Sequence, residues 1–81
     1  MNQPALPTKR ERLLNAAEIA LRDGGRPMHF TELAHVVYDR LGLVNEPAAR
    51  LNGVLHDDSS GRFRRTGRGR WSLANWIGVS E

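Results

Sequence analysis

The residues best suited to chemistry in this chain are arginines, and they gather near its end. The segment Arg62–Leu73, RFRRTGRGRWSL, holds five of the twelve basic residues and no acid. A guanidinium carries five N–H donors in a planar fork, which fits phosphate oxygens, guanine edges and carboxylates. The chemistry that this segment predicts is the binding of an anionic partner.

The same segment has the pattern of a β-hairpin. Phe63 on one side, and Trp71 and Leu73 on the other, alternate with polar neighbours, and Thr66–Gly69 lies between them. Glycine supplies the positive φ that such turns need, so the alternation and the turn predict two strands joined by a tight connection.

The alternation also predicts where the arginine side chains point. Arg64 and Arg70 are expected on the outward face and Arg68 at the tip, where they contact phosphates or enter a minor groove. The alternative is a solvated hairpin face, on which Arg65, in phase with Phe63, lays its stem along the core. The lack of acids on this hairpin favours contact with phosphates.

The positive charge of the chain is local to this end. The formal net charge is +3, but residues 1–61 hold seven basic and eight acidic groups, whereas residues 62–81 hold five arginines against Glu81 alone. Such a distribution is typical of a nucleic-acid-binding surface or of a dock for an acidic partner.

Patterns for catalysis or metal binding are missing. The chain has no cysteine, and His29, His35 and His56 lie on separate elements without ligand spacing, so we expect no metal site and no cofactor. Asp57 and Asp58 are the only adjacent carboxylates, and neighbours at a helix end point in different directions. We therefore expect that this protein is not an enzyme and has no small-molecule substrate.

The length of the chain limits the number of domains, and its hydropathy indicates where in the cell the protein is expected. A chain of 81 residues forms one small domain, with expected bounds of 8–77 between flexible tails at residues 1–7 and 78–81. An apolar leader and a run long enough to span a bilayer are both missing. We expect no membrane partner and a cytoplasmic protein, nucleoid-associated if its source is bacterial.

Three stretches with helical periodicity precede the hairpin. They predict helices over about Lys9–Asp23, Glu32–Leu41 and Pro47–Asp57. Arg26–Phe30 is expected to be an extended link or a one-bridge strand. The expected inward positions are Leu13, Leu14, Ala17, Ala20 and Leu21, then Leu33, Ala34, Val37 and Leu41, then Ala48, Leu51, Val54 and Leu55.

The helix starts are expected to be capped by side chains. Thr8 and Glu11 have the spacing of a capping box, in which each side chain bonds the amide of the other residue. Thr31 is the expected N-cap of the second helix, and Asn45 or Glu46 that of the third.

The solvent face of the third helix offers few groups for reading bases. It centres on Ala49 and Gly53, flanked by Arg50 and His56, and Asn52 lies toward the core edge. Base reading relies on Arg, Lys, Asn or Gln, so Arg50 and Asn52 are the expected contacts, with His56 exposed beside them. Gly53 indicates a close approach by another backbone, tight packing inside the domain or a tolerated imperfection.

Basic residues also open the first helix. Lys9, Arg10 and Arg12 stand at the end where the helix dipole disfavours positive charge. Nearby phosphates would explain this placement, and a solvated surface is the alternative. The candidate nucleic-acid-binding residues are Lys9, Arg10, Arg50, Asn52, His56, Arg64, Arg68 and Arg70.

The predicted order of elements is helix, short strand, helix, helix, hairpin. This is the order of a winged helix-turn-helix domain, with the third helix in the recognition position and the hairpin as the wing. The expected fold class is mainly α with a small β-hairpin (α+β), with three helices and a C-terminal sheet of two or three strands.

Motifs at both ends of this pattern resemble a known family. Gly25–Leu33 (GRPMHFTEL), the apolar third helix, and Gly67–Leu73 (GRGRWSL) after Phe63 together resemble the HARE-HTH family of winged helices. That family includes the N-terminal domain of the RNA polymerase delta subunit and domains attached to restriction endonucleases and chromatin proteins. The resemblance spans Thr8–Leu73 and implies a winged-helix fold with a role linked to nucleic acids. Members of the family are usually fused to catalytic or transcriptional modules, and these 81 residues show no such module. The expectation is therefore that any partner the domain needs is supplied in trans.

Two functions are consistent with these features. The first is a DNA-binding winged helix in transcription or DNA-associated machinery, which holds double-stranded DNA mainly by backbone and electrostatic contacts of the wing and the third helix. The second is a docking module for RNA polymerase or another nucleic-acid enzyme, in which the bare helix face is the contact surface.

Overall fold

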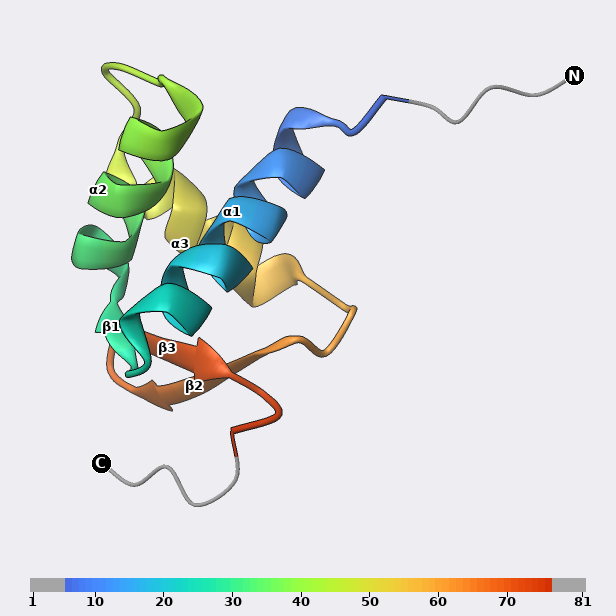
Figure 1. Cartoon of the computed structure of the whole chain (residues 1–81), viewed down its shortest axis with the longest axis vertical. Helices are drawn as coiled ribbons and strands as arrows, with labels where there is room; N and C mark the ends of the chain where they lie inside the picture. Colours follow the sequence, from blue (N-terminus) through green and yellow to red (C-terminus); the bar gives the residue numbers. More distant parts are fainter. Residues whose placement is uncertain (1–5, 77–81) are drawn as a thin grey trace, which may run out of the picture.

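The computed structural model describes residues 6–76, which form three helices and one antiparallel sheet. The elements are α1 (Lys9–Gly24), β1 (Met28–His29), α2 (Phe30–Leu41), α3 (Ala48–Asp57), β2 (Phe63–Gly67) and β3 (Arg70–Leu73). The sheet has the strand order β1-β3-β2 and lies below the helices in Figure 1, where α3 runs behind α1. The predicted winged helix-turn-helix of the α+β class is confirmed.

The start and end of α1 follow the sequence signals. Thr8 Oγ1 accepts a hydrogen bond from the Glu11 amide (3.1 Å), and Glu11 Oε1 accepts one from the Thr8 amide (2.9 Å), which is the predicted capping box. Gly24 closes the helix, and Gly25 follows in the left-handed region with φ of 67°.

The prediction of Thr31 as the N-cap of α2 is wrong, because the helix begins at Phe30 and His29 caps it. The Nδ1 atom of His29 accepts from the Thr31 amide (3.3 Å) and lies 2.8 Å from Thr31 Oγ1. His29 is still paired with β3, so the chain turns directly from strand into helix and a ring nitrogen replaces the hydroxyl as acceptor. Gly42 ends the helix with φ of 71°.

The prediction of Asn45 or Glu46 as the cap of α3 is also wrong. Pro47 is the N-cap, rather than a residue of the first turn, and the helix begins at Ala48 without a side-chain cap. Asn45 adopts a left-handed conformation with φ of 60°, and Glu46 forms ion pairs instead.

The hydroxyl of Tyr38 supplies the partner that α3 lacks at its start. It donates to the Pro47 carbonyl (2.9 Å) and accepts from the Leu51 amide (3.2 Å). These two backbone groups are four residues apart, the spacing at which a helix normally bonds them to each other. Burial raises the pKa of Tyr38, which keeps the hydroxyl protonated and able to donate.

The predicted inward faces of the helices form the core. The buried apolar residues that were predicted are Leu13, Leu14, Ala17, Ala20, Leu21, Leu33, Ala34, Val37, Leu51 and Leu55, and the sheet adds Met28, Trp71 and Leu73. Leu41, Ala48 and Val54 are partly buried against this cluster. The core therefore packs the three helices onto one face of the sheet.

The strands β2 and β3 form the predicted hairpin, with the turn one residue further along than predicted. Gly67 pairs with Arg70, so the connection is Arg68–Gly69. A register shift between Arg65 and Gly67 takes up the extra residue as a bulge.

The tip of the hairpin is fixed to the start of α2. His29 in β1 pairs with Arg70, and the Phe30 amide donates to the Gly69 carbonyl (2.7 Å). Gly69 has φ of 67°, and a Cβ there would lie 2.9 Å from His29 Nε2. Glycine meets both constraints, so the wing is short and anchored at its tip.

The predicted domain bounds stay a prediction. The boundary at residue 77 and the tail 78–81 lie outside the described residues, as does most of the tail 1–7. Between residues 6 and 76, no helix is long and apolar enough to cross a membrane.

Replacing Gly69 by Ala should destabilise the domain by about 1–3 kcal/mol, because the new side chain is strained and meets the ring that caps α2. The matched control is Gly53→Ala in α3, where a Cβ meets nothing within 4 Å and helix propensity predicts a gain of about 0.5–1 kcal/mol. Urea denaturation measures both. Equal stabilities of the two variants would contradict the anchored turn.

Replacing Tyr38 by Phe keeps the ring but removes the hydroxyl between Pro47 and Leu51. The free energy of unfolding should fall by about 1–2 kcal/mol, since two hydrogen bonds are removed and a direct helical bond restores part of their effect. Hydrogen exchange at the Leu51 amide should accelerate more than exchange elsewhere in α3. An unchanged Leu51 exchange rate would show that the hydroxyl does not hold this turn.

Candidate nucleic-acid interface

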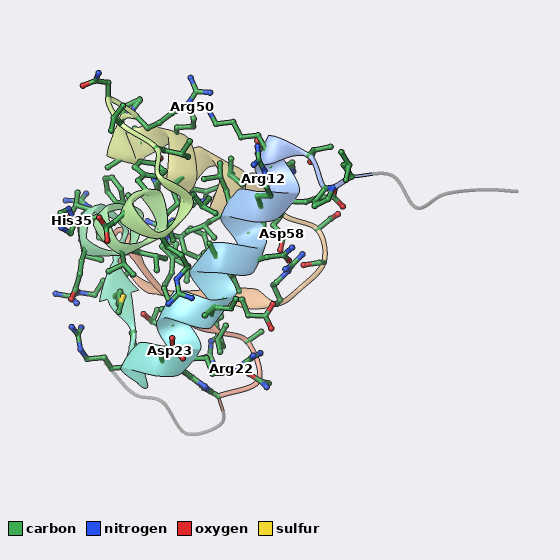
Figure 2. The ribbon with its side chains drawn as sticks, turned by 45° about the horizontal axis from the view of Figure 1, so that its top comes forward. Arg12, Arg22, Asp23, His35, Arg50 and Asp58 are labelled. Carbon is green, nitrogen blue, oxygen red and sulfur yellow. The ribbon has the colours of Figure 1, made fainter. Side chains whose placement is uncertain are left out.

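The outer face of α3 has two different flanks. Ala49 and Gly53 are exposed at its centre, and nothing lies within 4 Å of the Cβ that an alanine at residue 53 would have, so tight packing does not explain this glycine. Arg50 borders one flank and extends away from the body of the domain (Figure 2). Asn52 and His56 border the other flank.

Trp71 joins this second flank of α3 to the sheet. Its Nε1 donates to Asn52 Oδ1 (3.0 Å), and its ring meets the His56 imidazole edge to face with centroids 5.0 Å apart. Trp71 is only 4% exposed, so its N–H needs this partner. Asn52, a predicted base contact, has one lone pair of its oxygen engaged within the domain, and this bond fixes the direction of its side chain.

The sheet register divides the hairpin arginines between two faces. Residues paired across an antiparallel ladder share a face, and neighbours along a strand alternate. Arg65 is opposite Trp71 and lies on the face that meets α3. Arg64 lies on the other face, as does Arg70, which is opposite His29.

Arg65 is the hairpin residue that the sequence pattern misjudged. Alternation correctly put it in phase with Phe63, but its side chain is exposed and its Nε donates to the Gly67 carbonyl (3.3 Å). β2 is an edge strand and the bulge follows Arg65, so solvent reaches this side chain although Trp71 opposite it is buried. The glycine turn that follows is the signal that could have predicted this exposure.

Arg62 has a structural role at the start of the hairpin. It is partly buried, and its Nη1 donates to Asn15 Oδ1 (2.9 Å) and lies 3.3 Å from Glu18 Oε1. Both partners belong to α1. Arg62 therefore ties the chain before β2 to α1, where it shares the Glu18 carboxylate with Arg22.

The basic residues of the described chain fall into two groups. Six form ion pairs: Lys9, Arg22, Arg26, Arg40, Arg50 and Arg62. The other six have no ion-pair partner among residues 6–76: Arg10, Arg12, Arg64, Arg65, Arg68 and Arg70. The unpaired cations therefore occupy two places, the start of α1 and the hairpin.

Glu46 brings the start of α1 to the start of α3. Its Oε1 pairs with the Lys9 ammonium, and its Oε2 lies 3.1 Å from Arg50 Nε. The Lys9 contact is the main reason that the pKa of Glu46 lies below its ordinary value, with burial opposing and Arg50 assisting. Two predicted contacts, Lys9 and Arg50, thus lie together, and Arg10 follows Lys9 in the chain.

The three histidines lie on different elements. His29 caps α2, His56 contacts Trp71, and His35 is exposed on the outer side of α2 (Figure 2). Over residues 6–76, no group of three or more His, Asp or Glu side chains is arranged to hold a metal ion.

The family comparison covers α3 and the hairpin of this interface and begins after Lys9 and Arg10. The model of the HARE-HTH family, whose description names a restriction endonuclease HTH domain, matches residues 12–76. No curated protein and no solved structure matches the chain. The matched range is most of the chain, and it contains α3, the hairpin and most of α1. With the winged helix-turn-helix architecture beside it, this match means that the chain belongs to the HARE-HTH family of helix-turn-helix domains.

Proposed function

We propose that this domain binds double-stranded DNA and holds the sugar–phosphate backbone on both sides of α3, mainly by electrostatic contacts. The observation that carries the proposal is the set of hairpin arginines without an ion-pair partner in the described chain, Arg64, Arg65, Arg68 and Arg70. Membership of a helix-turn-helix family supports a nucleic acid as the partner.

The unpaired hairpin charges favour a polyanion over a small anion. Carboxylates neutralise arginines elsewhere, as Glu18 does for Arg62 and Glu32 for Arg26. None of the arginines of Arg64–Arg70 forms an ion pair within the described residues, although Glu32, which pairs with Arg26, is near enough for Arg70 to help lower its pKa. The hairpin cations therefore repel one another and raise the local potential. A phosphate chain that runs past several of them lowers that potential along its whole length.

The surroundings of α3 support a helix in the major groove. Glu46 holds Lys9 and Arg50 at one flank, and Trp71 holds the hairpin at the other flank. The major groove of B-DNA admits an α-helix, and phosphate chains run along both of its edges. With α3 in the groove, the two basic groups would each meet one of these chains.

Base discrimination by this surface should be weak. Ala49 and Gly53 at the centre of α3 carry no hydrogen-bonding side chain. The oxygen of Asn52 is bonded to Trp71, and Arg50 is paired with Glu46. Backbone contacts position a protein without reading sequence, so the affinity should depend on charge far more than on bases.

We place this activity in transcription or other DNA-associated machinery of the cytoplasm, without catalysis or a cofactor. The family description, which names a restriction endonuclease HTH domain, supports that setting. A second candidate function is docking to RNA polymerase or another nucleic-acid enzyme, and the bare face around Gly53 favours it. A stoichiometric protein partner in a pull-down, with no DNA binding near physiological salt, would support the second function.

Changing Arg64, Arg68 and Arg70 together to Ala should weaken binding to duplex DNA at least tenfold at low salt, because the variant can no longer make up to three bonds to phosphates. The plot of log K against log salt concentration should become less steep by about 0.9 for each phosphate that the variant no longer neutralises. Fluorescence anisotropy over a salt series measures both. The matched control changes Arg22, Arg26 and Arg40, which removes the same charge from paired positions. Unchanged affinity in the hairpin triple would remove Arg64, Arg68 and Arg70 from the mechanism and leave Arg65, beside α3, as the contact of the wing.

Single substitutions should show which face of the wing meets DNA. Arg65→Ala should weaken binding more than Arg64→Ala, because Arg65 shares a face with Trp71 beside α3 and Arg64 does not. Both variants lose one exposed arginine of the same strand, so each is the control of the other. A larger effect of Arg64→Ala would mean that DNA lies on the outer face of the sheet.

A further inference from the structure

We propose that Glu46 is an internal competitor of the DNA backbone: in the free domain its carboxylate occupies the place beside Lys9 and Arg50 that a phosphate takes in the complex. The inference rests on the proposed function, and it assigns to one acidic side chain the control of affinity at that site. It makes Glu46 a residue that lowers the affinity for DNA, although it lies among the residues that bind.

The geometry around Glu46 is that of one anion held between two cations. Its two oxygens face different partners, Oε1 the Lys9 ammonium and Oε2 the Arg50 guanidinium at 3.1 Å. Its own side chain is 14% exposed, whereas those of Lys9 and Arg50 are 43% and 53% exposed. Solvent, and therefore a ligand, reaches the cations more easily than it reaches the carboxylate between them.

A backbone phosphate has the chemistry to take over both partners. Like a carboxylate, a phosphodiester offers two anionic oxygens, and it accepts charge-assisted hydrogen bonds from ammonium and guanidinium groups. Exposed ion pairs contribute little to folding, so their exchange for phosphate leaves the fold intact. The Lys9 contact also lowers the pKa of Glu46, so the competing carboxylate is charged at neutral pH.

The local charge decides the direction of the effect. With Glu46 ionised, the cluster of Lys9, Glu46 and Arg50 presents a net charge of one, and a neutral residue at position 46 would present two. Gln has nearly the same shape and can still accept hydrogen bonds, so Glu46→Gln changes the charge with little change in packing. The two cations would then be free to contact phosphates from the outset.

The test compares binding of wild type and Glu46→Gln to one random-sequence duplex over a salt series. Glu46→Gln should bind roughly three- to tenfold more tightly at low salt, and its salt dependence should be steeper by up to about 0.9, which corresponds to the one positive charge that Glu46 otherwise cancels. Circular dichroism and thermal unfolding check that the variant is folded.

Two controls separate competition from a general change of charge. Asp23 lies at the end of α1 that is remote from Arg50 (Figure 2). Asp23→Asn makes the same change of charge and frees Arg40, and it should leave the affinity for DNA nearly unchanged. In a background with Lys9 and Arg50 both changed to Ala, Glu46→Gln should no longer tighten binding. Retained tightening in that background, or equal tightening by Asp23→Asn, would overturn the inference.

The remaining outcomes are also decisive. Weaker or unchanged binding by folded Glu46→Gln would show that Glu46 positions Lys9 and Arg50 instead of competing with DNA, which overturns the inference alone. No binding by the wild-type domain even at low salt would overturn the proposed function and this inference with it.

Discussion

The geometry of the candidate interface depends on the packing of Trp71 between the sheet and α3. Its indole is buried, bonded through Nε1 to Asn52 and in edge contact with His56. Truncation of a buried Trp typically costs about 3–5 kcal/mol, so this side chain is a large part of what fixes the hairpin beside α3. The turn at Gly69 is bonded to the start of α2, which holds the same strand just before Trp71. The wing therefore has a defined place beside α3.

Around that scaffold, the pairing of charges matters more than their number. The net charge of the chain is only +3. Carboxylates on α1, on α2 and in the loop before α3 form ion pairs with half of the basic side chains, and the hairpin beyond Arg62 forms no ion pair among the described residues. Since exposed ion pairs stabilise a fold little, their main effect is to decide where positive potential is left for a ligand.

The helices and the hairpin could be predicted because each buries an apolar face whose period is visible in the sequence. The capping box of α1 was predictable, but the starts of α2 and α3 were less so, because the groups that satisfy them carry no local signal. His29 acts through a ring nitrogen at the end of a strand, and Tyr38 reaches α3 from the preceding helix. Pattern rules that look for Thr, Asn or Glu at a cap therefore chose the wrong residues.

The sequence predicted which residues could contact DNA, but it predicted less well how their side chains are arranged around α3. Arg64, Arg68 and Arg70 could be named from their place in a glycine-bearing hairpin. Alternation predicted the side of the sheet that Arg65 occupies, but its exposure on that side depends on packing. The pairing of Lys9 with Glu46 joins residues 37 positions apart, beyond the reach of any local pattern.

The most direct test of a single DNA-binding surface around Trp71 is chemical-shift mapping of the isotope-labelled domain with a generic duplex at low and physiological salt. The account predicts shifts along α3, in the hairpin from Arg65 to Arg68 and at the Trp71 indole N–H, all of which weaken as salt rises. Shifts confined to α2 and the end of α1, or no shifts at low salt, would contradict it.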